Sequence, residues 1–182
     1  AISSGREPRC VALVGPFGSG KTSLLEAILA RTDKVDRQGM ISDGNTIGDG
    51  SAEARAHGMS VELNIADAEY LGDRFPFIDW PGSVEFLGEM DSALSGADLA
   101  VVVAEDDERK VPALQLILKA LEARAIPRVL FLNKIDKSNR RVRDVLTLLQ
   151  PASEVPLVLR QIPVWENGHA TGFIDLALER AH

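Results

Sequence analysis

Cys10-Val11-Ala12-Leu13-Val14-Gly15-Pro16-Phe17-Gly18-Ser19-Gly20-Lys21-Thr22 is the stretch that decides the fold of this chain. Residues 10–14 form an apolar, partly β-branched run, which is typical of a buried parallel strand. Residues 15–22 satisfy the pattern G-x-x-x-x-G-K-[ST]. Leucine and isoleucine then recur at helical spacing from Leu24 to Leu29. A strand, a glycine-rich turn and a helix in this order predict a phosphate-binding loop in an α/β fold.

The chemistry of this loop follows from its residue types. Glycines allow the backbone to turn tightly and to present several N–H groups to phosphate oxygens, and the helix N-terminus adds the positive end of its dipole. We expect Lys21 to reach the β- and γ-phosphates of a nucleotide and the Thr22 hydroxyl to bind Mg²⁺. A glycine-rich turn without a ligand is the alternative, and the flanking strand and helix argue against it. The residues expected to contact nucleotide here are Gly15, Phe17, Gly18, Ser19, Gly20, Lys21, Thr22 and Ser23.

Composition narrows the class of protein. With 182 residues and 45% hydrophobic content, the chain can bury one good core. The formal net charge of −7 and the mixed-sign background disfavour nonspecific binding to nucleic acid or an anionic membrane. The lone Cys10 excludes an internal disulfide and fits a reducing compartment. We therefore expect a cytoplasmic, monomeric protein without a membrane anchor and without direct sequence-specific binding of nucleic acid.

Apolar runs alternate with helical patterns along the chain, which predicts a mostly parallel central sheet with helices on both faces. Residues 61–65 alternate as a half-exposed strand, and residues 71–74 turn the chain into a second strand that ends at Ile78. This pair predicts an antiparallel hairpin that adds one antiparallel edge strand, where Pro76 is tolerable. The other expected elements are a mobile loop at 38–58, a helix around 86–90, a strand at 99–104, a helix over 114–121 with Pro112 in its first turn, a strand at 129–132, a helix over 142–149 and a strand at 156–162.

A second motif, Asn133-Lys134-Ile135-Asp136, follows a buried strand. It predicts that the site recognises guanine and not adenine. Guanine presents donors at N1 and N2, and the Asp136 carboxylate can accept from both, whereas adenine would leave that carboxylate unpaired. A site built on such hydrogen bonds rejects the analogue by roughly 10⁴-fold or more. We expect Asn133 to brace the loop and touch the base, and the Lys134 stem to lie over the ring. Alone these four residues also fit an ordinary strand-to-helix turn; after a phosphate loop they predict guanine recognition.

Asp79-Trp80-Pro81-Gly82 lies between these two motifs, at the carboxyl end of a strand, where ligands bind in open α/β sheets. Asp79 is expected to hold Mg²⁺ through a water, and the Gly82 amide to sense the γ-phosphate. The alternative is that Asp79 simply caps the following helix. The acidic stretch Glu105-Asp106-Asp107-Glu108 also follows a strand, and we expect it to be a solvated loop and not a cation site.

The chain resembles the translational GTPases, and elongation factor G most closely. In the segment between the phosphate loop and the D-x-x-G motif, that family carries an Asp-Gly and a second Asp five residues later. A Gly-hydrophobic-Thr follows and supplies a magnesium ligand. Asp43-Gly44, Asp49 and Gly58-Met59-Ser60 occupy these positions without a gap. Further similarity lies in residues 77–86, which resemble the second switch, residues 127–136, which resemble the base-specificity strand, and residues 161–168 and 172–176, which resemble the start of a subdomain inserted in elongation factor G.

The resemblance implies a P-loop NTPase fold of the GTPase G-domain type over residues 1–156, with residues 157–182 forming the truncated start of the inserted subdomain. It implies a chain that binds GTP and GDP with Mg²⁺ and hydrolyses GTP to switch conformations on the ribosome, which would be contacted through the full-length protein. The implied roles are nucleotide binding by Asn133, Lys134 and Asp136 in addition to the phosphate loop, catalysis by Lys21, Gly82 and Ser83, and metal binding by Thr22, Ser60 and Asp79.

Four departures from the family pattern bear on activity. Ser83 stands where a histidine normally positions the attacking water, and Ser60 replaces a threonine but keeps its oxygen. Gly18 replaces a common aspartate, and the Ser-Ala base-contacting motif is absent, so we expect an excised domain of a larger protein. A guanine-nucleotide-binding, ribosome-associated protein with little hydrolysis is therefore the second hypothesis. A small-molecule kinase is the third, and it leaves residues 133–136 unexplained.

Overall fold

The computed structural model describes residues 9–32, 64–80, 94 and 96–182. The expected loop at 38–58 and the expected helix around 86–90 lie outside these residues. The described elements are β1 (Val11–Val14), α1 (Lys21–Arg31), β2 (Asn64–Tyr70), β3 (Asp73–Asp79), β4 (Leu99–Ala104), η3 (Glu108–Lys110), α4 (Val111–Ala123), β5 (Arg128–Leu132), η4 (Ile135–Lys137), α5 (Val142–Leu149), η5 (Gln150–Ala152), β6 (Gln161–Glu166), β7 (His169–Asp175) and β8 (Arg180–Ala181).

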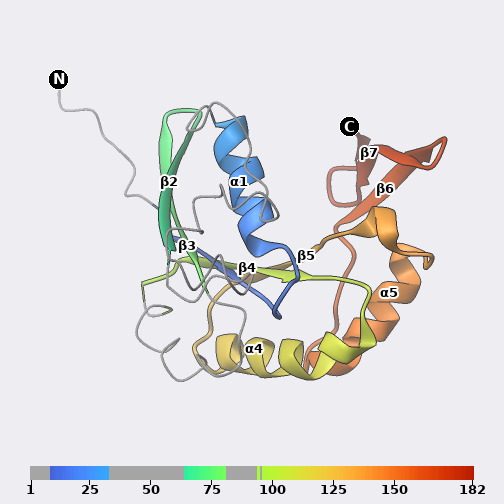
Figure 1. Ribbon diagram of the computed structural model, residues 1–182, viewed down its shortest axis with the longest axis horizontal. Helices are drawn as coiled ribbons and strands as arrows, with labels where there is room; N and C mark the ends of the chain where they lie inside the picture. Colours follow the sequence, from blue (N-terminus) through green and yellow to red (C-terminus); the bar gives the residue numbers. More distant parts are fainter. Residues whose placement is uncertain (1–8, 33–63, 81–93, 95) are drawn as a thin grey trace, which may run out of the picture.

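The central sheet has five strands in the order β2-β3-β1-β4-β5 (Figure 1). Strand β1 pairs in parallel with β3 on one side and with β4 on the other, and β4 pairs in parallel with β5. Only β2, at the edge, runs antiparallel to its neighbour. The predicted fold class, a mostly parallel sheet with one antiparallel edge strand, is confirmed.

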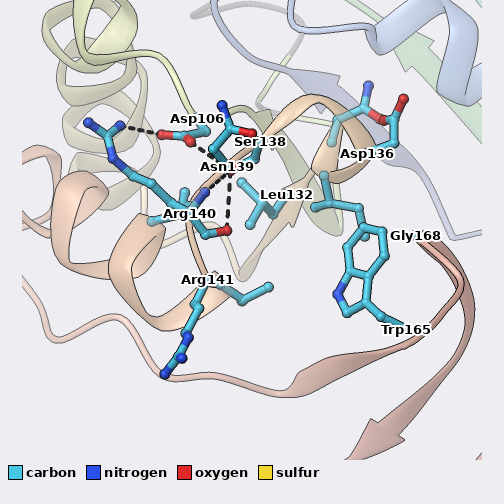
Figure 2. A pocket seen from close by; sticks show the side chains of 13 residues that line it. Asp106, Leu132, Asp136, Ser138, Asn139, Arg140, Arg141, Trp165 and Gly168 are labelled. Carbon is cyan, nitrogen blue, oxygen red and sulfur yellow. Dashed lines mark hydrogen bonds and ion pairs between the residues drawn. The ribbon is translucent and has the colours of Figure 1, made fainter.

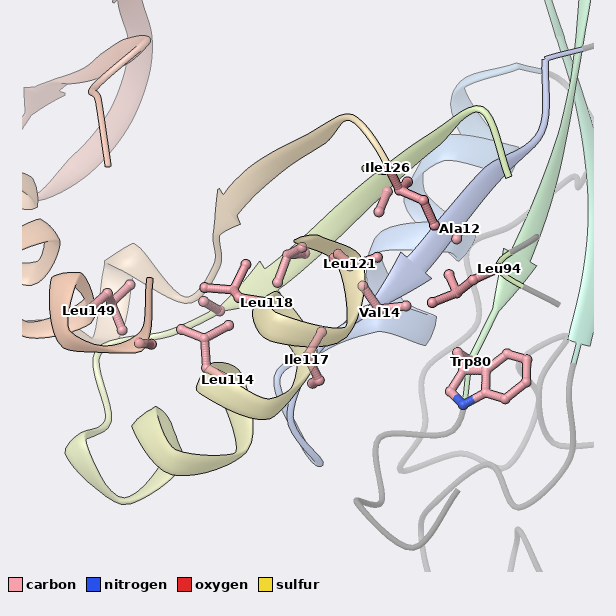
Figure 3. Close-up of a cluster of buried hydrophobic side chains, with 14 of the residues drawn as sticks. Ala12, Val14, Trp80, Leu94, Leu114, Ile117, Leu118, Leu121, Ile126 and Leu149 are labelled. Atoms are coloured by element: carbon pink, nitrogen blue, oxygen red, sulfur yellow. The ribbon is translucent and has the colours of Figure 1, made fainter. Parts of the chain in front are cut away.

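Helices cover both faces of this sheet because the side chains of each strand alternate between the faces. On β1, Val11 and Leu13 belong to a buried cluster with Leu25 and Leu29 of α1. Their neighbours Ala12 and Val14 point the other way and pack in the larger cluster, which holds the buried residues of α4 and α5 (Figure 3). The apolar run at 10–14 is therefore buried on two sides, as a parallel strand between helical layers requires.

Helix α4 supplies much of the larger core. Pro112 lies in its first turn, where the missing N–H has no helical partner to lose. Leu114, Ile117, Leu118 and Leu121 are its buried side chains, at the spacing that brings them onto one face. Leu116, on the opposite face, is 49% exposed. The sequence-based prediction of this helix and of its buried face is confirmed.

The hairpin of β2 and β3 turns through two residues, Leu71 and Gly72, both of which have positive φ. Such a turn matches the twist of the two strands that it joins. Asp73 and Arg74, both expected in the turn, lie in β3 instead, opposite Tyr70 and Glu69 of β2. Pro76 lies in β3, opposite Asp67 of β2, and β3 is an interior strand of the sheet, so the proline is not in the edge strand as expected. Register pairing of β3 with β1 begins at the next residue, Phe77.

A second, antiparallel sheet contains β6, β7 and β8. The prediction of a strand over 156–162 is wrong for residues 156–160, because strand pairing begins at Gln161 and is with β7, not with the central sheet. The Gln150 side chain accepts from the Leu157 backbone N–H and donates to the Val155 carbonyl, which takes the place of ladder hydrogen bonds. In the described parts of the chain, no helix is long and apolar enough to cross a membrane.

Candidate functional site

The candidate residues come from loops that follow neighbouring parallel strands. The phosphate loop follows β1, Asp79 ends β3, Glu105 follows β4, and Asn133 follows β5. Because parallel strands end at the same edge of a sheet, these loops lie together at that edge, which is where open α/β sheets bind ligands. The sheet thus gathers residues that are far apart in the sequence.

The phosphate loop is a tight turn that leads directly into α1. Gly18 and Gly20 have φ values of 69° and 95°, in the left-handed region that glycine adopts most readily. Lys21, the first residue of α1, is only 7% exposed. Its ammonium donates to the carbonyls of Gly15 at 3.1 Å and Pro16 at 3.4 Å, within its own loop. The helix N-terminus and this ammonium therefore face the same loop, as a phosphate site requires.

Burial also changes the ionisation of Lys21. Desolvation lowers its pKa to about 8, the charge of Asp79 opposes the shift, and the charge of Lys110 adds to it. A buried ammonium whose hydrogen-bond partners are neutral carbonyls would gain much from an anionic ligand.

Thr22 and Asp79 form the candidate magnesium pair. The Thr22 hydroxyl donates to a carboxylate oxygen of Asp79 at 2.9 Å, and Asp79 is 1% exposed. Burial raises the pKa of Asp79, while the hydrogen bond from Thr22 and the charge of Lys21 act in the opposite direction. Oxygen donors of these two kinds beside a phosphate loop fit Mg²⁺, which keeps waters and prefers one or two carboxylates together with phosphate oxygens. Ser60, the third expected metal ligand, lies outside the described residues.

The loop after β5 docks directly on the phosphate loop. Asn133 donates its side-chain amide to the carbonyl of Ser19 at 2.9 Å, and Lys134 donates its ammonium to the carbonyl of Gly18 at 2.5 Å. A Cβ at position 20 would lie 2.3 Å from the Asn133 amide nitrogen, so glycine is required for this approach. The contact joins residues more than 110 positions apart and brings the two sequence motifs into one unit.

A cavity of about 300 Å³ lies beside the loop after β5, residues 133–136, which we call the base-recognition loop after its expected role (Figure 2). Asn133 and Asp136 line it together with Trp165 and Gly168, which come from β6 and the turn after it. No phosphate-loop residue lines this cavity. Asp136 therefore has open space beside it, whereas Lys21 is enclosed in the phosphate loop.

The acidic stretch after β4 differs from the sequence-based expectation. Glu105 and Asp106 have side chains only 12% exposed, so the interpretation as a solvated loop is wrong for these two residues. Asp106 accepts from Ser138 at 2.6 Å and pairs with Arg140, both just beyond the base-recognition loop (Figure 2). Their hydrogen bonds and charges hold the pKa of Asp106 below its usual range.

Of two residues near the phosphate loop, sequence reasoning missed Lys110 and assigned Glu105 only to a solvated acidic loop. Glu105 binds the ammonium groups of both Lys110 and Lys134. Neither belongs to a motif, and only the spacing of Lys110 five residues after Glu105, at the start of a helix, could have signalled the pair. Of the remaining predicted residues, Phe17 is 49% exposed at the tip of the phosphate loop, while Gly82 and Ser83 lie outside the described residues.

Comparison with known proteins identifies the family of this chain. Residues 6–164 match the family described as the elongation factor Tu GTP binding domain. An elongation factor G-like protein from Synechocystis sp. is 44% identical over 96% of this chain and 26% of its own length. One from Mycobacterium tuberculosis is 34% identical over 79% of this chain and 20% of its own length. A crystal structure of a Thermus thermophilus protein aligns with a TM-score of 0.82 at 32% identity, covering 96% of this chain and 26% of that one.

The sheet order, the phosphate loop and the docked base-recognition loop, together with these matches, define a GTP-binding domain of the phosphate-loop α/β class. Its relatives are proteins of translation, and the chain spans about a quarter of the length of the first of them. The chain belongs to the translational GTPase family and is similar in sequence to elongation factor G-like proteins.

Proposed function

We propose that this chain binds GTP and GDP with Mg²⁺, hydrolyses GTP, and serves as the nucleotide switch of an elongation factor G-like protein that acts on the ribosome. The observation that carries the proposal is the docking of Asn133 and Lys134 on the carbonyls of the phosphate loop. Because the two loops touch, one molecule can span them with its phosphates on one loop and its purine on the other. The similarity to elongation factors supports the ribosome as partner.

Each residue has a distinct part in this proposal. Backbone N–H groups of residues 15 and 17–20 and the Lys21 ammonium would bind phosphate oxygens, after Lys21 exchanges its carbonyl partners for them. Thr22 and Asp79 would hold Mg²⁺, which supplies charge stabilisation to the phosphates when bound. Asp136 would accept the guanine N1 and N2 donors. Gly82 and Ser60 are proposed from the sequence alone as the groups that sense the γ-phosphate.

A titration of the purified full-length protein with GTP and ATP in the presence of Mg²⁺ tests nucleotide binding. We expect binding of GTP to be tighter than that of ATP by orders of magnitude, because adenine leaves the Asp136 carboxylate unpaired. Magnesium-dependent binding of GTP that is no tighter than that of ATP would reject the proposal. A phosphoryl transfer to a nucleoside or sugar would revive the kinase hypothesis instead.

A second candidate function is GTP binding on the ribosome with little turnover, which is favoured by Ser83 at the position of the usual histidine. A serine hydroxyl has neither the reach nor the charge of an imidazole for positioning a water. Single-turnover GTP cleavage with and without ribosomes separates the two functions. Strong stimulation by ribosomes eliminates the second candidate, and its absence in a protein that binds GTP tightly favours it.

A further inference from the structure

One buried carboxylate holds two ammonium groups beside the phosphate loop. Glu105, 12% exposed, pairs with Lys134 at 2.7 Å through one oxygen and with Lys110 through the other. Burial raises the pKa of Glu105, but the hydrogen bonds and charges of Lys110 and Lys134 outweigh this effect, and the net pKa is below its usual range. Glu105 is thus an anion that gathers two cations at one place.

That place is the phosphate loop at Gly18. Lys134 donates to the Gly18 carbonyl, and a Cβ at position 18 would lie 3.4 Å from the Lys110 ammonium nitrogen. The charge of Lys110 also reaches Lys21, where it contributes to lowering the pKa. Glycine at position 18 leaves the space between the loop and Lys110 without a side chain. Lys110 is therefore near the loop although it comes from the start of α4.

The Lys110 ammonium is held but not enclosed. Its side chain is 26% exposed, against 12% for Glu105, so one side of it remains open to a ligand. Glu105 serves two ammonium groups through its two oxygens, while Lys21 also feels the charge of Asp79, and Asp107 lies within electrostatic reach of Lys110. A phosphate oxygen at the loop could accept from the open side of the Lys110 ammonium, because a lysine has three donors.

We propose that Lys110 is an additional phosphate-binding residue, which binds an oxygen of the nucleotide phosphates at the rim of the loop beside Gly18. Glu105 is its positioning residue, since it fixes the ammonium on the side of α4 that faces the loop. The inference rests on the proposed function, because it takes the ligand to be a guanine nucleotide. It goes beyond the sequence motifs, in which neither residue occurs.

Lys110→Met in the full-length protein tests this role, because methionine keeps an unbranched apolar stem and removes the charge. We expect GTP and GDP to bind about tenfold more weakly, as for the loss of one charge-assisted hydrogen bond. Guanosine, which lacks phosphates, should bind equally well to the variant and the parent protein, and the salt dependence of GTP binding should decrease. Lys119→Met, an exposed lysine of the same helix, is the matched control and should leave every affinity unchanged.

Lys110→Arg distinguishes charge from packing. Arginine retains a cation, so we expect affinity for GTP within about threefold of the parent protein. The inference is overturned if Lys110→Met matches Lys119→Met, if guanosine weakens as much as GTP, or if Lys110→Arg loses as much affinity as Lys110→Met. Failure of the proposed function has a different signature, namely that the parent protein shows no preference for guanine nucleotides, and the inference then fails with it.

Discussion

Burying the Lys21 ammonium disfavours its charged form, and the same ammonium is the group that we propose binds phosphate. Its side chain is 7% exposed, and its ammonium donates hydrogen bonds to backbone carbonyls of its own loop. Burial disfavours the charged form, which lowers the pKa of this lysine from the ordinary 10.5 to about 8. The unfolded chain therefore binds more protons than the folded chain between these two pH values, so folding stability from this group increases as pH rises through that window.

Nucleotide binding should have the opposite dependence on pH. Phosphates stabilise the Lys21 ammonium, so affinity for GDP should be constant below the pKa of about 8 and fall as pH rises above it, because the proton must then be restored. A titration series from about pH 7 to about pH 9 measures this change. Guanosine, titrated over the same range, reports any contribution of the base. An affinity for GDP that tracks that of guanosine at every pH would show that Lys21 does not meet the phosphates.

At the level of elements, a substitution of Gly20 tests the contact between the phosphate loop and the base-recognition loop. A Cβ there would lie 2.3 Å from the Asn133 amide nitrogen, and φ is 95°. We expect Gly20→Ala to separate the two loops and weaken GTP binding by about a hundredfold or more, because both the phosphate cradle and the base loop would shift. Isothermal titration provides the affinity.

Gly72→Ala is the matched control for this variant. Gly72 also has positive φ, at 83°, but nothing lies within 4 Å of a Cβ placed there. The control therefore reproduces the backbone strain, about 1 kcal/mol, without the clash. Equal losses of GTP affinity in the two variants would mean that the loop contact does not matter for binding.

Elements that carry their own local signal were predictable from the sequence. Helix α4 has an apolar face at helical spacing and a proline in its first turn, and the phosphate loop has its glycines. The extended segment at 156–160 was predicted wrongly, because its short apolar run resembles a strand, whereas the Leu157 N–H bonds to the side chain of Gln150, which comes from another element. Lys110 was missed and Glu105 was taken for a solvated residue, because the contacts of Lys110 beside Gly18 and of Glu105 with Lys134 join residues that are distant in sequence.

At the scale of the whole molecule, the two clusters on either side of the sheet hold the loops in place. Leu121, in the larger cluster, is 0% exposed, and Leu116 on the same helix is 49% exposed. We expect Leu121→Ala to lower the free energy of unfolding by about 2–5 kcal/mol, because it leaves a cavity in the core, and Leu116→Ala to lower it far less. Urea denaturation without nucleotide measures both. Equal effects would contradict the described packing of α4.

The central claim is that two loops at one sheet edge bind a single guanine nucleotide, and Asp136→Asn tests it most directly. The change replaces an acceptor by a donor, so GTP affinity should fall by about a hundredfold or more, while xanthosine triphosphate, which has an oxygen at the 2-position, should gain relative to it. Competitive titration of the two nucleotides on the variant and the parent protein gives this ratio. An unchanged preference for GTP would contradict the claim.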